Sequence, residues 1–339
     1  MICHSQYRSR RIFSGLDGLR ALCVIGVVWH HCGARIPLPI ASNGFLGVDV
    51  FFALSGFLIV TLLLRERDRH GRISLRDFYM RRTLRIFPLY YGILLGLLLL
   101  HTLAPFTTTQ YAFDHAPYLF TYTSDLVVVP GALAVGWSLA AEEQFYLVWP
   151  TIERFGARAW WVLGAVGIGV SQCFNFGVFP NYGLEILQTT FTPILLGVGL
   201  AHALHDPKTF ARLAPWLRSP VLRALTVVAV LVLANYPGDV AGAPRLAFHI
   251  AVTALVAVVV TRQPGAKGIL DAWVLRRIGA VSYGVYLLHM FVMTLVTKAV
   301  PGPAYGTFVM VMIGSWGAAE LSYRGFERHF IALKHRFAR

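Results

Sequence analysis

GLRALCVIGVVWHHCG, residues 18–33, carries ionisable side chains inside a stretch that is otherwise apolar. An α-helix turns by about 100° per residue, so the eleven steps from Arg20 to His31 bring these two side chains to nearly one face. His30 lies about 80° from Arg20 by the same arithmetic. Ionisable groups within a membrane span are costly and usually face a protein interior or a water-filled path. The stretch therefore predicts a membrane helix with a functional face, and it favours His31 over His30.

The composition of the chain is typical of a membrane protein. Hydrophobic residues make up 56% of the 339 residues and charged residues 14%, whereas a soluble domain carries about 25% charged residues. No long polar stretch leaves room for a second domain, so we expect one membrane domain over residues 1–339 and no appended soluble domain. No metal-ligand spacing or disulfide framework is formed by the cysteines Cys3, Cys23, Cys32 and Cys173.

Apolar runs long enough to cross a bilayer, about 20 residues each, recur along the chain. They predict an all-α, polytopic integral membrane protein with about ten transmembrane helices. The predicted spans are residues 15–34, 44–64, 86–105, 133–151, 159–177, 183–203, 219–236, 245–261, 279–298 and 304–323.

The basic residues, which give a net charge of +14, fall in alternate loops between these spans. The predicted loop from Arg65 to Arg85 is rich in arginine, whereas the loop with Asp114 and Asp125 has no Lys or Arg; Arg245 is the main exception on that side. Basic loops stay in the cytoplasm, so we expect both termini there and the protein in the inner (cytoplasmic) membrane. Membrane lipids are expected partners, and nucleic acid is not, because the charge is divided among short membrane-flanking loops.

Helix geometry also predicts which polar residues share a depth in the bilayer. A rise of about 1.5 Å per residue puts His31 roughly 16 Å beyond Arg20, toward the outer side. The second span returns inward, so Asp49 is expected at a depth similar to that of His31. Glu142 and Glu143 follow in the outer or middle part of the fourth span, and their side chains point about 100° apart. Only one of the two is therefore expected to face the interior.

Other classes of protein could use buried charges in this way. A transporter or flippase would use buried Arg, His, Asp and Glu as a proton relay or a binding site, although the chain shows no obvious duplicated halves. A structural or sensory membrane protein would use them only to hold helices together. No metal site is expected, because adjacent residues such as His30 and His31 cannot both face one centre from a regular helix.

The order of five motifs resembles acyltransferase family 3, whose members are membrane enzymes that transfer acyl groups, often acetyl, to sugars and other hydroxylated acceptors. The resemblance covers nearly the whole chain. Its motifs are LDGLRALCVIGVVWHH at residues 16–31, GFLGVDVFFALSGFLI at 44–59, FYMRRTLRIFPLYY at 78–91, WSLAAEEQFYLVWP at 137–150 and IGAVSYGVYLLH at 278–289. Near the carboxyl end, SYRGFERHF at 322–330 is similar to the final family segment, with His329 where proline is usual.

The resemblance implies roles for individual residues. The arginine-to-histidine motif falls on Arg20 and His31, and the glycine-valine-aspartate motif on Asp49. The tryptophan-serine-leucine motif favours Glu142 over Glu143. Residues implied in substrate binding are Trp137, Ser138, Tyr283 and His289, and the paired arginines of the family fall on Arg82 and Arg85.

Acyl transfer from a thioester requires a base, a partner for the base, and cations for the donor's phosphates. His31 is the predicted general base, because imidazole titrates near neutral pH. Asp49 or Glu142 is the predicted partner. Arg82 and Arg85 are three residues apart at the cytoplasmic mouth of a span and could both reach one pyrophosphate of acyl-coenzyme A.

Arg20 is predicted to line the path of the donor's pantetheine arm. Acetyl-coenzyme A is the donor implied by the resemblance, and a sugar, glycan or secreted metabolite is the acceptor. Direct attack by the acceptor hydroxyl and a covalent acyl-histidine intermediate both remain open.

Overall fold

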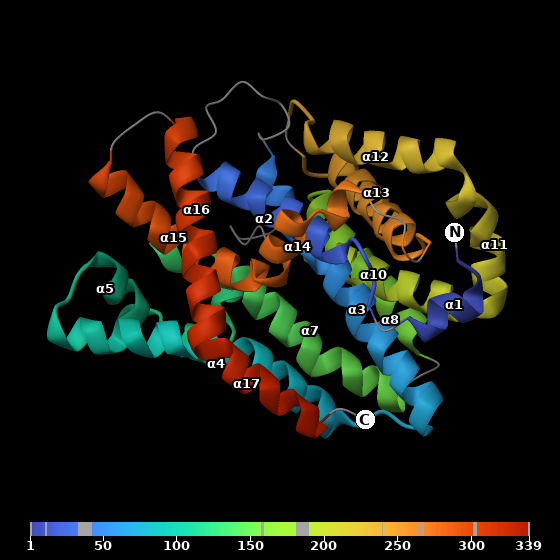
Figure 1. Ribbon diagram of the computed structural model, residues 1–339, viewed down its shortest axis with the longest axis horizontal. Coiled ribbons are helices and arrows are strands. Elements are labelled where there is room, and N and C mark those ends of the chain that lie inside the picture. Colours follow the sequence, from blue (N-terminus) through green and yellow to red (C-terminus); the bar gives the residue numbers. More distant parts are fainter. Residues whose placement is uncertain are drawn as a thin grey trace. The chain divides into compact units, whose positions relative to one another are not determined.

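The computed structural model describes residues 2–10, 12–32, 43–156, 159–180, 190–238, 240–263, 265, 268–300 and 304–337. Within these residues the regular structure is helical and no strand occurs (Figure 1). The predicted all-α fold class is confirmed for the part of the chain that the structure describes.

The long helices follow the predicted spans. They are α2 (Leu16–His31), α3 (Gly47–His70), α4 (Leu75–Leu103), α7 (Gly136–Phe155), α8 (Trp160–Asn175), α10 (Phe191–His205), α12 (Pro220–Ala234), α13 (Ala243–Val260), α15 (Ser282–Ala299) and α16 (Ala304–Ser322). The shorter helices are α1 (His4–Ser9), α5 (Thr107–Asp114), α6 (Ala116–Phe120), α11 (Pro207–Arg218), α14 (Trp273–Ala280) and α17 (Arg328–Ala332). Single turns and other short helical segments are η2 (Gly44–Leu46), η3 (Ser124–Leu126), η4 (Gly131–Leu133), η5 (Ile269–Asp271), η6 (Tyr323–Glu327) and η7 (Leu333–Phe337).

Each of the ten predicted spans overlaps one of the long helices, although residues 33 and 34 of the first span and residues 183–189 of the sixth lie outside the described residues. In the described part of the chain, three helical segments are long and apolar enough to cross a membrane: Gly44–His70, Leu75–Leu103 and Ala243–Val260. The number rises to five if the bent pairs α11–α12 and α14–α15 each form one span. The structure thus contains helices that could span a membrane, and the number ten and the orientation of the termini stay predictions.

The arginine-rich segment from Arg65 to Arg85, which we predicted as a loop, is mostly helical instead, because α3 runs to His70 and α4 begins at Leu75. The end of α3 is capped by Gly71, whose φ of +68° is a left-handed conformation that glycine adopts without strain. The next helix begins four residues later, where the Ser74 hydroxyl accepts a hydrogen bond from the backbone amide of Asp77. Arginine is a good helix former, so a basic composition alone does not end a helix.

The helices form two compact units. The first unit consists of Met1–His30, Ala34–Ile73 and Ile152–Ala280, and the second consists of His31–Gly33, Ser74–Thr151 and Val281–Arg339.

In the first unit, α3 and α10 cross with their backbones in contact. A Cβ atom added to Gly56 would lie 2.0 Å from the carbonyl oxygen of Ile194, and one added to Gly197 would lie 2.2 Å from that of Ala53. Real Cβ atoms do not approach so closely, so both positions require glycine. Close packing through small residues is typical of helices in membranes, where apolar burial alone does not drive association.

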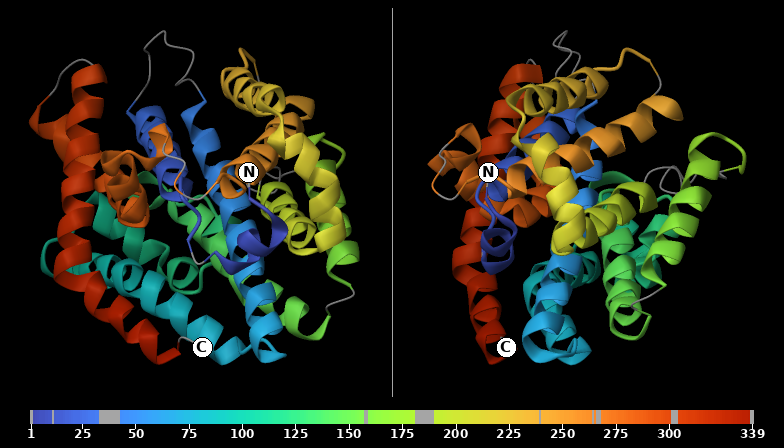
Figure 2. Two further views of the ribbon diagram at one scale, coloured as in Figure 1. Left: turned by 45° about the vertical axis from the view of Figure 1, so that its right-hand side comes forward. Right: turned by 90° about the vertical axis from the view of Figure 1, so that its right-hand side faces the viewer.

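In the second unit, α15 packs against α16, and the C-terminal segments α17 and η7 pack along α4. Figure 2 shows α17 beside the N-terminal part of α4. Gly284 of α15 faces Ala319 of α16, where an added Cβ would lie 3.0 Å from the alanine side chain. The chain therefore returns at its C-terminal end to the helix that carries the paired arginines.

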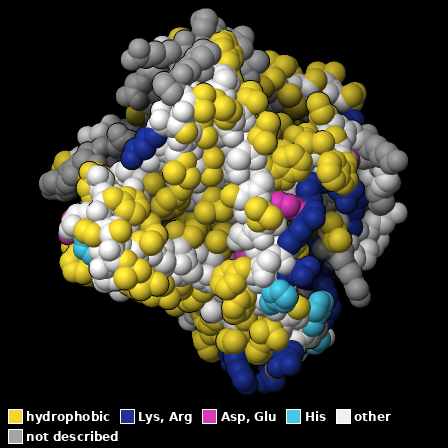
Figure 3. Space-filling view, turned by 60° about the vertical axis from the view of Figure 1, so that its left-hand side comes forward, with side chains coloured by type: hydrophobic (Ala, Val, Ile, Leu, Met, Phe, Trp, Pro, Cys, Tyr) yellow, Lys and Arg dark blue, Asp and Glu magenta, His cyan; other side chains and the backbone are white. Residues whose placement is uncertain are grey.

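Many large apolar side chains lie on the surface. Leu95, Leu99 and Leu103 of α4 are 56%, 61% and 73% exposed, and they follow each other at helical spacing. Hydrophobic side chains also cover broad areas in the space-filling view (Figure 3). A soluble monomer rarely exposes patches of this kind, whereas lipid tails cover them without cost.

Candidate active site

Two histidines from distant parts of the sequence meet in the second unit. His31 is the last residue of α2, and its ring centroid lies 5.2 Å from that of His289 on α15, with an angle of 47° between the planes. His289 is fully buried and His31 is half-buried. The structure thus brings together the predicted base and one of the predicted substrate-binding residues.

The hydrogen bonds of His289 define which of its nitrogens is basic. Its Nδ1 atom lies 2.5 Å from the backbone carbonyl oxygen of Tyr286. A carbonyl oxygen only accepts, so Nδ1 carries the proton and the lone pair of the neutral ring is on Nε2. The Nε2 atom is buried and has no hydrogen-bond partner among the described residues. A buried, oriented and unpartnered acceptor nitrogen is a group that can take a proton or bind a hydroxyl.

Ser138 connects the beginning of α7 to α15. Its hydroxyl oxygen lies 2.6 Å from that of Tyr286, and it donates to the carbonyl of Val135 at 3.2 Å. The Tyr286 ring lies 5.7 Å from that of His289. Ser138 therefore helps to fix the α15 turn whose carbonyl orients His289, while the adjacent Trp137 is half-buried.

Tyr283 performs a similar task one turn earlier. Its hydroxyl donates to the carbonyl of Ile86 at 3.0 Å, and this bond links α15 to α4. Ile86 follows Arg85 directly in the sequence. The late serine-tyrosine motif is thus tied both to the helix of the paired arginines and to the histidine pair.

The paired arginines lie near the beginning of α4, and both are half-buried. The guanidinium of Arg82 stands 5.0 Å from the ring centroid of Tyr146 and 5.9 Å from that of Phe78. Arg82 also interacts electrostatically with Glu143, and Arg85 with Glu327. Two half-buried guanidinium groups three residues apart can bind a phosphate or a carboxylate.

Glu142 and Glu143 are both half-buried on α7 and both belong to the second unit. The expectation that only one of them faces the interior is not resolved by burial. The choice of Glu142 as the partner of the base stays a prediction.

Asp49 is the centre of a buried cluster in the first unit. Its Oδ2 atom lies 2.7 Å from Nε of Arg245 and 3.0 Å from Nε2 of His249, and its Oδ1 accepts a hydrogen bond from Nη2 of Arg245 at 3.0 Å. Asp49 and His249 are almost fully buried, and Arg245 is 7% exposed. Both oxygens of the carboxylate are thus engaged by α13, while the predicted pairing of Asp49 with His31, a residue of the second unit, stays a prediction.

Sequence reasoning noted Arg245 as an exception to the charge pattern but did not give it a role, and it missed His249. The signal was present, because a lone arginine on the weakly charged side precedes a histidine by four residues, which places both on one helical face. Arg20, which we predicted to line the donor path, is half-buried in the first unit. Its Nη1 atom lies 3.5 Å from Oδ1 of Asp17. That contact is consistent with a local ion pair.

Another acid and histidine pair was also missed in the first unit. The fully buried Glu153 lies 2.9 Å from Nε2 of His202, whose ring stacks on Trp160 at 3.7 Å. Among the described residues, no group of three or more His, Cys, Asp or Glu side chains could hold a metal ion.

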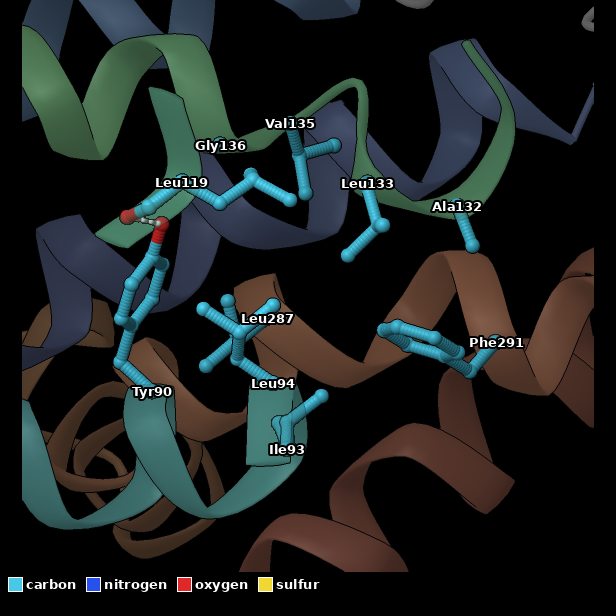
Figure 4. A pocket seen from close by; sticks show the side chains of 10 residues that line it. All are labelled: Tyr90, Ile93, Leu94, Leu119, Ala132, Leu133, Val135, Gly136, Leu287 and Phe291. Carbon is cyan, nitrogen blue, oxygen red and sulfur yellow. Dashed lines mark hydrogen bonds between the residues drawn. The ribbon is translucent and has the colours of Figure 1, made fainter. Parts of the chain in front are cut away.

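An apolar pocket opens beside α15 in the second unit (Figure 4). Tyr90 at its edge donates to the carbonyl of Leu119 at 2.9 Å. Phe291 and Leu287 line it, whereas His289 projects about 200° round the helix from Leu287, so the pocket is on the other side of α15 from the histidine pair. The full lining is Tyr90, Ile93, Leu94, Leu119, Ala132, Leu133, Val135, Gly136, Leu287 and Phe291.

Comparison with known proteins places the chain in a family. The model of the acyltransferase domain of family 3 matches residues 13–320. The chain therefore belongs to acyltransferase family 3, as its motifs predicted.

Curated relatives match almost the whole chain. The peptidoglycan O-acetyltransferase OatA of Listeria monocytogenes is 27% identical over 94% of this chain and 56% of its own length. YrhL of Bacillus subtilis, which is provisionally named a peptidoglycan O-acetyltransferase, is 30% identical over 94% of this chain and 55% of its own length. The chain thus spans about half the length of these relatives. No solved structure matches it.

Proposed function

We propose that this chain is a multi-pass inner-membrane O-acyltransferase that transfers an acyl group, in the simplest case acetyl, from cytoplasmic acyl-coenzyme A to a hydroxyl of a glycan, with both termini in the cytoplasm. The observation that carries the proposal is the pairing of His31 with His289 in a chain of this family. The names of the relatives support a cell-wall glycan as the acceptor class. The hydroxyl group of a sugar or a secreted metabolite could accept the acyl group by the same chemistry.

In the proposed reaction, His31 takes the proton of the acceptor hydroxyl while the oxygen attacks the carbonyl carbon of the thioester. The carbon–sulfur bond then breaks, and the imidazolium returns its proton to the sulfur of coenzyme A. The products are an O-acyl ester and free coenzyme A. Nε2 of His289 accepts a hydrogen bond beside the base, from the acceptor hydroxyl or from the His31 ring. An acyl-histidine route would use the same residues in two steps.

The donor's phosphates are assigned to Arg82 and Arg85, because half-buried guanidinium groups at helical spacing bind phosphate oxygens bidentately. Arg20 is assigned to the path of the donor arm, and Trp137 and Tyr283 to the acceptor side. Asp49 or Glu142 is the proposed partner of the base. No resident metal is required for these steps.

The test uses purified chain in proteoliposomes with labelled acetyl-coenzyme A and soluble peptidoglycan fragments. Mass spectrometry of the acceptor should show a gain of one acetyl group with the wild type and none with His31→Ala. His329→Gln is the matched control, because His329 is an exposed histidine of the same unit. Transport of the acceptor without modification would contradict the proposal and support a flippase.

A further inference from the structure

Cations gather in the second unit where the C-terminal segment meets the beginning of α4. Arg81, Arg82 and Arg85 occupy the first turns of that helix, and Lys334 is in η7, which packs against it. The family model ends at residue 320, so Lys334 lies outside the part of the chain that the family describes.

The packing of η7 against α4 places Lys334 beside that helix. The guanidinium of Arg81 donates to the backbone carbonyl of Phe337 at 2.7 Å and thereby fastens η7 to the helix. A 3₁₀-helix has three residues per turn, so residues 334 and 337 lie one above the other on the same side. Lys334 is half-buried, in contrast to the exposed side chains of its neighbours His335 and Arg336.

The surroundings of Lys334 are strongly cationic. Burial, followed by the guanidinium groups of Arg85, Arg82 and Arg81, lowers the pKa of the Lys334 amine to about 7. Glu327 is buried at the end of η6, where Ser322 donates to it at 2.8 Å. Burial raises the pKa of Glu327, and Arg85 opposes this increase. The other charged groups near the beginning of α4 and on η6, α17 and η7 are the buried Asp77 and the exposed residues Arg76, Arg324, Arg328, His329, His335 and Arg336. Glu143 of α7 interacts with Arg82.

We propose that η7 and the beginning of α4 form a binding site for a polyphosphate, in which the amine of Lys334 contacts the phosphate groups together with Arg82 and Arg85, and Arg81 holds the segment in place. Like charges held together destabilise the folded chain, and an anionic ligand offsets that repulsion. The inference rests on the proposed function only in naming the ligand, the phosphates of coenzyme A. The cluster itself is independent of the acceptor and of the base.

A bound polyphosphate favours the charged form of Lys334, so binding and protonation are linked. The amine is charged below pH 7 and loses its proton above it. Affinity for the ligand is therefore expected to be greatest below pH 7 and to fall as the pH rises through 7. Arginine at this position stays charged, because its ordinary pKa is above about 12.

The experiment measures the dissociation constant of coenzyme A by calorimetry between pH 6 and pH 8.5, with the full chain in nanodiscs of zwitterionic lipid. Lys334→Gln should weaken binding at pH 6 by about tenfold, the size of one charge-assisted hydrogen bond, and by less at pH 8.5. Lys334→Arg should keep the affinity and remove most of the decline above pH 7. The ligand's 3′-phosphate loses its second proton at about pH 6 and becomes more negative, so its own titration strengthens binding as the pH rises and opposes the decline.

Lys298→Gln is the control, because it removes the same charge from an exposed position on α15. It should leave the binding curve unchanged. Equal thermal stability of the variants shows that they fold. Dephospho-coenzyme A, which lacks the 3′-phosphate, tells which phosphate Lys334 contacts: a smaller effect of Lys334→Gln with this ligand assigns the 3′-phosphate, and an equal effect assigns the diphosphate.

Wild-type affinity in Lys334→Gln at pH 6 would overturn the proposal, as would an absence of coenzyme A binding by the wild type. A lipid phosphate is the other ligand that this site could bind. If phosphatidylglycerol stabilised the wild type but not Lys334→Gln, and both bound coenzyme A equally well, the site would bind a lipid and the proposal would be contradicted. If the wild type transfers acetyl groups and Lys334→Gln binds coenzyme A as tightly as the wild type, the phosphate site is contradicted and the proposed function stands. If coenzyme A binds and Lys334→Gln weakens that binding, but the wild type transfers no acetyl group, the phosphate site stands and the proposed function is contradicted.

Discussion

The two buried histidine clusters differ in the group that binds each buried histidine. In the first unit, both carboxylate oxygens of Asp49 are engaged by Arg245 and His249. In the second unit, His31 lies against a histidine whose Nε2 has no hydrogen-bond partner among the described residues. Nδ1 of His249 is likewise buried and has no hydrogen-bond partner among the described residues, so the first cluster is distinguished by its ion pair, which joins α3 to α13, whereas Nδ1 of His289 is bonded to a backbone carbonyl. We therefore expect changes in the first cluster to act mainly on stability and changes in the second to act mainly on turnover.

The largest expected effect is on turnover by the histidine pair. His289→Ala should reduce acetyl transfer by roughly 100-fold to 10,000-fold, the range typical of a group that handles the proton. Thermal stability should change little by comparison. His289→Asn keeps a hydrogen-bonding side chain and should recover part of the activity. Wild-type turnover by His289→Ala, measured with the labelled donor, would place His289 among packing residues and remove the difference between the clusters.

The opposite result is expected for the first cluster, where the effect should be on stability. Asp49→Asn leaves Arg245 buried without its counter-ion and should cost about 3–5 kcal/mol of unfolding free energy. Chemical denaturation in detergent measures this loss. Asp49→Leu combined with Arg245→Met should be less destabilising than either single change, because it removes both charges. A stable Asp49→Asn variant that has lost activity would instead support Asp49 as the partner of the base.

The glycine crossing of the first unit gives a smaller effect of the same kind. Gly56→Ala introduces a Cβ that would lie 2.0 Å from a backbone oxygen, so α3 and α10 must move apart at a cost of about 1–3 kcal/mol. Gly96→Ala is the matched control, because nothing lies within 4 Å of that position. Thermal unfolding should separate the two variants, and equal melting temperatures would show that the crossing is not fixed by Gly56.

The smallest effect is expected at the hydroxyl pair that supports the second cluster. Ser138→Ala removes the hydroxyl 2.6 Å from that of Tyr286, and a neutral hydrogen bond contributes about 0.5–1.5 kcal/mol. We expect a modest loss of stability together with a several-fold loss of turnover, because the carbonyl of Tyr286 orients His289. A loss as large as that of His289→Ala would assign Ser138 to the substrate.

Hydropathy and helical periodicity predicted the helices well, and the functional face of the first long helix stays a prediction. Arg20 and His31 lie on one helix as expected, and each predicted span overlaps a helix. Depth along the membrane is one coordinate, however, and it does not tell which helices are neighbours. Depth therefore suggested Asp49 as the acidic partner of His31, which stays a prediction. The contacts within the two units join Asp49 to His249 and His31 to His289.

The C-terminal cations could not be found from the sequence. Lys334 is one of several basic residues in a basic tail, and only its packing along α4 distinguishes it. The predicted loop before α4 failed for a related reason, because charge density marks a membrane boundary but does not end a helix. Sequence patterns thus named candidate residues along the chain, and side-chain contacts were needed to show which of them lie together.

The most direct test of the account is a single-turnover measurement of acetyl transfer in proteoliposomes, with labelled acetyl-coenzyme A and a peptidoglycan fragment, for the wild type and His31→Gln. The account predicts that the wild type releases one coenzyme A for each acetyl ester formed. His31→Gln should fold and bind coenzyme A as the wild type does but form no ester. Ester formation at the wild-type rate by His31→Gln would contradict the central claim that the histidine pair of the second unit is the catalytic centre.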